Sequence, residues 1–143
     1  MANEIIYSSV FKVTKGNNRY QRPLASYQDD QSGVGGPTPG SFLATTGGTI
    51  VNLSELTVPG WCSIINYDAD NFITVGVWLH DQGYFAPFME IPAGKYAHLK
   101  LSRFLNQEFD FTGTGTGTTG ELNELMVVAD TANCEVSVEA FEA

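Results

Sequence analysis

The chain has 143 residues, of which sixteen are Asp or Glu and seven are Lys or Arg, so that its formal net charge is -9. This length suits one domain with an ordinary core, and the scarcity of bases argues against a nucleic-acid partner, because phosphate binding needs a concentrated basic patch. A hydrophobic fraction of 43% with 12% aromatic residues excludes a disordered chain.

A period of two recurs along the chain and a period of 3.6 is nearly absent, which predicts an all-β domain. Residues 5–13 alternate and end at the turn residues 15–18, while the polar segment 19–28 is at best an edge strand because Pro23 removes a ladder donor. Further strands are predicted over residues 48–56, 61–68, 72–79, 84–92, 95–104, 125–130 and 134–141. We expect one domain over residues 1–143, an antiparallel β-sandwich or jelly roll, although a β-barrel would leave nearly the same pattern.

Two segments are poor in packing residues. Residues 29–41 contain four glycines and two prolines, which predicts either a flexible surface loop or a binding arm that becomes ordered on a neighbour. Residues 111–120 alternate Gly with Thr over most of their length, and a flexible loop is favoured there over a strand weakened by glycine.

The predicted strand at 72–79 is apolar on both faces. Ile73, Val75, Val77 and Leu79 share one face, and Phe72, Thr74, Gly76 and Trp78 share the other. A strand of this kind in a small protein predicts that its second face meets another subunit or another chain.

The polar cluster from Asn66 to Asn71 invites a test for calcium. An EF-hand loop needs oxygen ligands at positions 1, 3 and 5 and a Glu at position 12. Counting from Asp68 puts Phe72 at position 5, and counting from Asn66 puts Val77 at position 12, so both registers fail. Asn and Asp accept hydrogen bonds from nearby backbone N–H groups in Asx turns, and we therefore predict a strand corner with no metal.

No residue set for catalysis is present. The sequence has no GxSxG motif, and His80 and His98 are expected to be exposed strand residues. Glu108 and Asp110 would lie side by side on one strand and not across a groove. A phosphate-binding loop is followed by a Lys and a helix, and the Gly/Thr segment is followed by neither. We expect no catalytic residue, no cofactor and no enzymatic activity.

Targeting signals and cysteine motifs are also missing from the pattern. The first residues, MANEIIYSSV, lack the basic and apolar regions of a secretory signal, and no apolar run reaches the length of a membrane span. We expect a soluble protein that is made in a cytoplasm and does not contact membranes. Cys62 and Cys134 form no CxxC motif, so we expect them to be small buried residues.

Aromatic residues are dense between Trp61 and Phe88, and residues 57–93 contain no Lys or Arg. Such residues fill a core, stack on carbohydrate or build a protein interface. The candidate interface residues are these aromatic side chains together with residues of the Gly/Pro segment: Trp61, Phe72, Trp78, Tyr84, Phe85, Val34, Pro37 and Pro39.

Two motifs give the chain a resemblance to a known class of proteins. The first reads N-x-D-x-x-N-F-I-x-x-G from Asn66 to Gly76, and the second reads F-x-P-F-x-x-I-x-A-G-K from Phe85 to Lys95. Together with the closing strand that ends in acidic residues, they cover about residues 59–142. This arrangement resembles small structural proteins of tailed-bacteriophage virions.

The resemblance implies a structural component of a phage particle, made in the cytoplasm of the host bacterium. The first expectation is a capsid decoration or cement protein, because such proteins need extended arms and apolar subunit contacts. The expected partners are copies of itself, as a dimer or trimer, and the major capsid protein or another virion protein. The alternative is a neck, tail or fibre component, which includes a carbohydrate-binding module in a tail or fibre.

Overall fold

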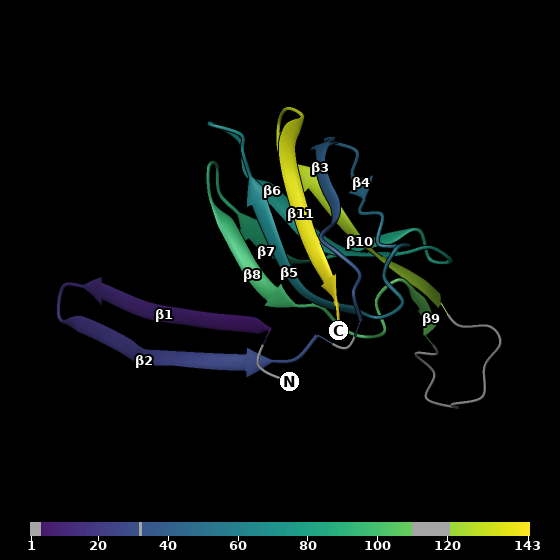
Figure 1. Ribbon diagram of the computed structural model, residues 1–143. Helices are drawn as coiled ribbons and strands as arrows, with labels where there is room; N and C mark the ends of the chain where they lie inside the picture. The colour runs from purple at the N-terminus through teal and green to yellow at the C-terminus, as the bar shows by residue number, and fades with distance from the viewer. Residues whose placement is uncertain (1–3, 32, 110–120) are drawn as a thin grey trace. The chain divides into compact units, whose positions relative to one another are not determined.

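Figure 1 shows a computed structural model of the protein, which describes residues 4–31, 33–109 and 121–143. Eleven strands and no helix occur in these ranges, which confirms the all-β prediction. In this described part no helix has the length and apolar character needed to cross a membrane. The chain divides into two compact units, residues 1–32 and residues 33–143, where the sequence predicted one domain. The predicted Gly/Thr loop at 111–120 lies outside the described residues.

The first unit is a long antiparallel hairpin. Strand β1 (Ile5–Lys15) pairs with β2 (Asn18–Asp29) through a turn in which Gly16 has a φ of +57°, a backbone conformation that favours glycine. The pairing register shifts between Ser9 and Phe11, and β2 has one additional residue there, next to Pro23. A bulge leaves a residue out of the ladder, which explains how a proline fits in a strand of this length.

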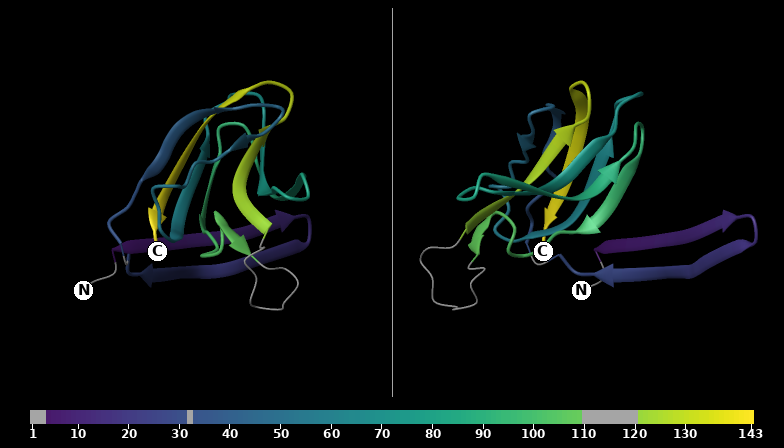
Figure 2. Two further views of the ribbon diagram at one scale, coloured as in Figure 1. Left: turned by 90° about the vertical axis from the view of Figure 1, so that its right-hand side faces the viewer. Right: turned by 180° about the vertical axis from the view of Figure 1, so that it is seen from behind.

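The second unit contains two sheets that face each other as a sandwich (Figure 2). The β11 sheet has the order β3 (Thr38–Ala44), β11 (Cys134–Glu142), β5 (Pro59–Asn66) and β8 (Tyr96–Lys100). The β10 sheet has the order β4 (Thr49–Ile50), β10 (Glu121–Ala129), β6 (Ile73–Leu79) and β7 (Tyr84–Ile91), with β9 (Gln107–Phe109) also paired to β10. The two strand orders do not join, so the fold is a sandwich and not a closed barrel.

The core lies between the two sheets. Alternate residues of the four central strands point into it and are almost completely buried: Ile73, Val75, Leu125, Val127, Cys62, Ile64, Val136 and Val138. Both cysteines are free and buried, as predicted. Burial, with a smaller contribution from the charge of Glu139, raises the pKa of the Cys62 thiol to about 12.

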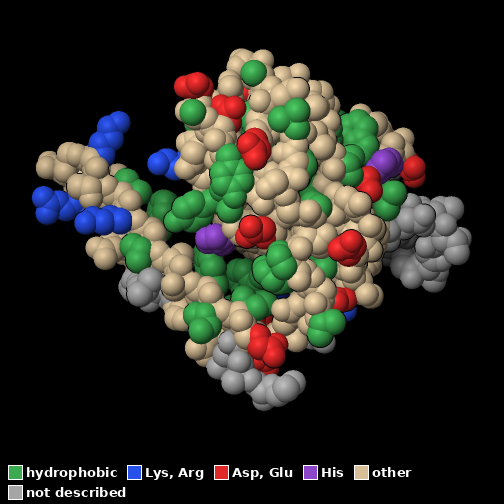
Figure 3. Space-filling model, turned by 45° about the horizontal axis from the view of Figure 1, so that its top comes forward, with side chains coloured by type: hydrophobic (Ala, Val, Ile, Leu, Met, Phe, Trp, Pro, Cys, Tyr) green, Lys and Arg blue, Asp and Glu red, His purple; other side chains and the backbone are tan. Residues whose placement is uncertain are grey.

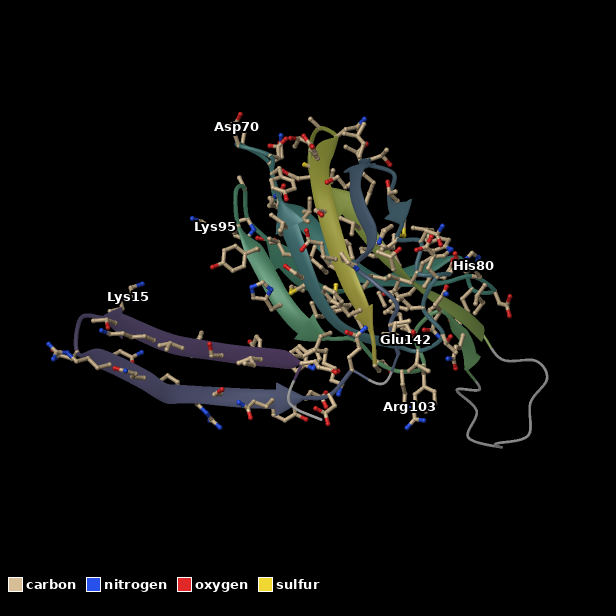
Figure 4. The ribbon with its side chains drawn as sticks, in the orientation of Figure 1. Lys15, Asp70, His80, Lys95, Arg103 and Glu142 are labelled. Atoms are coloured by element: carbon tan, nitrogen blue, oxygen red, sulfur yellow. The ribbon has the colours of Figure 1, made fainter. Side chains whose placement is uncertain are left out.

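The Gly/Pro segment is shorter than the sequence predicted over 29–41. Residue 29 is the last of β2, and β3 begins at Thr38 and includes Pro39. Proline is accepted there because β3 is an edge strand that pairs with β11 alone. The preceding residues bind the end of β11, since the Gly35 N–H donates to Glu142 Oε2 over 3.3 Å. Glu142 is labelled in Figure 4.

Two predicted strands are shorter than expected. Of residues 48–56 only Thr49–Ile50 belong to a strand, because Asn52 Oδ1 accepts the Ser54 N–H over 3.0 Å and turns the chain. Of residues 95–104 the strand keeps 96–100, and Ser102 Oγ then accepts the Phe104 N–H over 3.2 Å. In both places a polar side chain competes with the sheet for backbone hydrogen bonds.

Candidate interaction surfaces

The polar corner between β5 and β6 is an Asx turn, as the sequence predicted. Asp68 Oδ1 accepts the N–H groups of Asp70 and Asn71 over 2.9 and 2.6 Å, and it also accepts from the Asn71 side-chain amide. These hydrogen bonds, of which the one from the Asn71 N–H is the strongest cause, lower the pKa of Asp68. Asp70 lies at the tip of the corner in Figure 4. One oxygen of the carboxylate therefore binds the backbone of the corner.

Asn66 joins this corner to the end of β7. Its side chain is only 1% exposed, its Oδ1 accepts the Asp68 N–H over 3.0 Å, and its Nδ2 donates to the Asn71 carbonyl over 2.9 Å. The same Nδ2 lies 3.3 Å from the carbonyl oxygens of Ile91 and Pro92. The buried amide is thus fully used within the fold. Across the described ranges, no group of three or more His, Cys, Asp or Glu side chains could hold a metal ion.

The outer face of the β10 sheet carries the second apolar face of β6. Trp78 on β6 lies directly opposite Phe85 on β7, and both are half-buried. A Cβ atom at Gly76 would lie 2.5 Å from a Phe85 ring carbon and 2.5 Å from the Ala86 carbonyl oxygen, so the Phe85 ring covers this glycine. The protein's own side chains therefore occupy part of the face for which the sequence predicted a partner.

Polar groups complete this outer face. His80 follows β6, and its Nε2 pairs with Glu124 Oε2 on β10. The Trp78 ring meets the His80 ring edge to face, with 6.3 Å between the ring centroids. His80 is labelled in Figure 4. His80 and Glu124 are thus already hydrogen-bonded to each other on this face.

The eight predicted interface residues do not form one surface. Trp78 and Phe85 share the outer face of the β10 sheet, whereas Trp61 lies on the outer face of the β11 sheet. Tyr84 begins β7 and is exposed. Phe72 is half-buried before β6, where its carbonyl accepts the Asp130 N–H over 3.2 Å. The three residues of the Gly/Pro segment are exposed, and they are Val34, Pro37 and Pro39.

The outer face of the β11 sheet mixes apolar and acidic side chains in rows. The register places Leu43, Glu135 and Tyr67 in one row, then Ser41, Ser137, Ile65 and Tyr96, then Pro39, Glu139, Ser63 and His98. Tyr96 is 65% exposed, and Leu43 and Tyr67 are exposed by more than half. The Tyr96 and His98 rings lie 5.0 Å apart. His98 is exposed, as predicted, but the sequence did not single out Leu43 or Tyr96.

The hairpin presents a third apolar surface, which we call the aromatic face. Its members point to one side of the two strands: Ile5, Tyr7, Phe11, Val13, Tyr20 and Tyr27. Phe11 is 63% exposed, and its ring meets that of Tyr20 edge to face at 5.9 Å. Two strands alone are marginally stable in water, and monomers rarely expose contiguous apolar patches of this kind. The sequence did not identify this surface, because it predicted one domain over residues 1–143.

Comparison of the chain with protein-family models, with curated proteins and with solved structures gave no match.

Proposed function

We propose that this chain is a structural protein of a bacteriophage particle, in the first place a capsid decoration or cement protein that binds and stabilises the shell. The proposal gives the chain a binding role and no enzymatic activity. It rests on the resemblance of residues 59–142 to small virion proteins and on one structural observation, the exposed aromatic face of the hairpin.

The two motifs behind the resemblance form one structural unit, which supports the proposal. The first motif supplies the corner and β6, and the second supplies β7 and the turn into β8. Asn66 of the first motif binds the second through its side chain, at Ile91 and Pro92, and through its N–H, which donates to the Lys95 carbonyl over 2.9 Å. The two motifs are therefore in contact with each other in the fold.

The aromatic face supplies what a cement protein needs. Burial of apolar area contributes about 25 cal/mol per Å², and Phe11, Tyr20 and Tyr27 each have about half or more of their surface available. A contact of this kind that is repeated over the many identical subunits of a shell adds up through multivalency.

The test is the number of copies in purified particles of the phage that encodes the chain, measured by quantitative mass spectrometry. A cement protein is expected at a copy number comparable to that of the major capsid protein. A few copies per particle would instead favour a neck, tail or fibre component, and absence from purified particles would overturn the proposal.

A second candidate function, a carbohydrate-binding module in a tail or fibre, is favoured by one observation. Trp61, Tyr96 and His98 lie on the same outer face of the β11 sheet, beside the carboxylate of Glu139. Aromatic rings stack on sugars while polar groups bind hydroxyls. This function predicts that host polysaccharide changes tryptophan fluorescence and that Tyr96→Ala weakens the change. No response to any host polysaccharide would eliminate it.

A further inference from the structure

The charges of the chain are divided unequally between its two units. Residues 1–32 hold four of the seven Lys and Arg and only three of the sixteen Asp and Glu. Residues 33–143 therefore hold three bases against thirteen acids. Figure 3 shows the basic side chains gathered at one end of the hairpin and the acidic ones spread over the visible face of the second unit. The whole-chain charge of -9 hides this division.

The basic residues of the hairpin lie at its turn end. Between residues 5 and 28 the hairpin contains no acid, and its four bases all fall between Lys12 and Arg22. Two of them belong to the aromatic face, because Arg22 pairs with Phe11 and Lys15 follows Phe11 at an interval of four residues on the same strand. Lys15 lies beside the turn in Figure 4. The row between these two cations holds Val13 and Tyr20.

The outer face of the β11 sheet has the complementary arrangement. Glu135 and Glu139 lie on one strand with an interval of four residues, and both point outward. The row between them holds Ser41 and Ser137 together with Ile65 and Tyr96. Four residues of extended chain span about 13 Å. The two bases of the hairpin, which lie on different strands, and the two acids of the sheet are therefore each separated by about this length along the strand direction, with one row of side chains between them.

We propose that the hairpin of one copy of this chain binds the outer face of the β11 sheet of a second copy. The aromatic face covers Tyr96 and Ile65, and Lys15 and Arg22 pair with Glu135 and Glu139. Each copy carries both surfaces, so the contact is self-complementary and links identical chains. This contact does not depend on the proposed function and holds for the purified protein alone.

The outer face of the β10 sheet fits the hairpin less well. Its central aromatic residue, Phe85, already packs over Gly76, and its carboxylate at Glu124 is paired with His80. A hairpin that docked there would have to displace both interactions. On the β11 sheet, Tyr96 and Leu43 remain largely exposed.

The test is a charge exchange followed by sedimentation velocity on the full chain. Lys15→Glu with Arg22→Glu, and separately Glu135→Lys with Glu139→Lys, should each weaken self-association at least about tenfold, because like charges then face each other. An equimolar mixture of the two variants should associate again, since the reversed hairpin of one variant then meets the reversed sheet of the other with opposite charge. Wild-type association should weaken between about 0.05 and 0.5 M salt.

Matched controls carry the same charge changes on other faces. Lys12→Glu with Arg19→Glu alters the opposite side of the hairpin, and Glu55→Lys with Glu90→Lys alters the segment before β5 and strand β7 of the β10 sheet. Both should leave the association constant within about threefold of wild type. If circular dichroism shows that the variant with Glu139→Lys is unfolded, the variant Glu135→Lys with Tyr96→Ala is used in its place.

Three results would overturn the proposal. Wild-type protein that stays monomeric up to about 100 µM has no such contact of useful strength. Oligomers that keep their affinity in both reversed variants are held by another surface. Reversed variants that each lose association but do not recover it on mixing show that the hairpin and this sheet are not partners.

Discussion

Replacement of Asn66 by Asp is the sharpest test of how the corner is held. The substitution keeps the shape of the side chain and its Oδ1 acceptor, but it removes the amide that donates to the carbonyls of Asn71, Ile91 and Pro92. A carboxylate in its place directs negative charge at three carbonyl oxygens in a site that is 1% exposed. The buried carboxylate would keep only the Asp68 N–H as a hydrogen-bond donor.

The expected cost follows from these contacts. Leaving buried carbonyls without donors costs about 1–3 kcal/mol. Burial of a charge that has a single hydrogen-bond donor raises the total cost to about 3–5 kcal/mol at neutral pH. The unfavourable environment raises the pKa of the new carboxyl above about 3.9, its value in the unfolded chain. The penalty is therefore smallest below that pH, where the acid is protonated and can donate, and grows as pH rises.

Urea unfolding of Asn66→Asp, measured at about pH 4 and about pH 7, checks both statements. Asn52→Asp is the matched control, because Asn52 uses only its oxygen, which accepts the Ser54 N–H, and Asp keeps that acceptor. It should change the free energy of unfolding by less than about 0.5 kcal/mol. An Asn66→Asp protein within about 1 kcal/mol of wild type at neutral pH, or one with no additional pH dependence, would show that the Asn66 amide does not hold the corner.

Three further predictions concern packing, thiols and acid stability. Gly76→Ala should destabilise by about 1–3 kcal/mol, because the added methyl meets a backbone carbonyl and a ring. Gly47→Ala meets only Thr45 Oγ1, at the ordinary contact distance of 4.0 Å, and should be neutral in the same urea titration. Cys62 and Cys134 should not react with a thiol reagent at about pH 8 in the folded protein and should both react in guanidinium, since burial raises both pKa values; rapid labelling of folded protein would contradict this. The pKa of Asp68 is lowered in the folded state, so its stabilising contribution is present above the unfolded pKa and disappears as pH falls through the acid range. Asp68→Asn should lack that acid-dependent part, and identical pH profiles between about pH 2 and 5 would count against it.

Local patterns predicted the local structure well. The alternation at 72–79 corresponds to β6, with Ile73 and Val75 completely buried, and the Asx turn at the corner follows from the side chains of Asn66 and Asp68. Both depend on residues near one another in sequence. The predicted strand boundaries were wrong where a single polar side chain ended a strand early. Asn52 is an example, because its amide oxygen accepts a backbone N–H.

Pairings across the chain were beyond the sequence pattern. Trp61 and Trp78 both lie on alternating strands, yet they occupy opposite outer faces of the sandwich, because β5 pairs with β8 and β11 while β6 pairs with β7 and β10. Alternation says that two sets of side chains point to opposite faces of one strand. It does not say which strands lie side by side, and so it grouped aromatic residues that the fold separates.

For the hairpin, too, alternation alone could not predict which strands pair, but the charge of the segment was informative. The alternation of residues 5–13 is the same for a strand that joins a core and for one that does not. Charge counted by segment is more informative, because four bases without an acid at 12–22 mark this stretch as different from the rest of the chain. The net charge of the whole chain, -9, does not reveal this basic stretch.

The local basic charge also decides how the hairpin's partner is to be tested. Four cations can neutralise at most four phosphates, which gives a nucleic acid only a weak contact with a salt slope of about -3.6. Such a contact would be lost in every hairpin variant, including Lys12→Glu with Arg19→Glu on the far side of the aromatic face. Binding to the β11 sheet instead depends on Lys15 and Arg22 and is restored when Glu135 and Glu139 are reversed on a second copy. Recovery on mixing therefore separates a protein partner of defined geometry from a polyanion that responds to total charge alone.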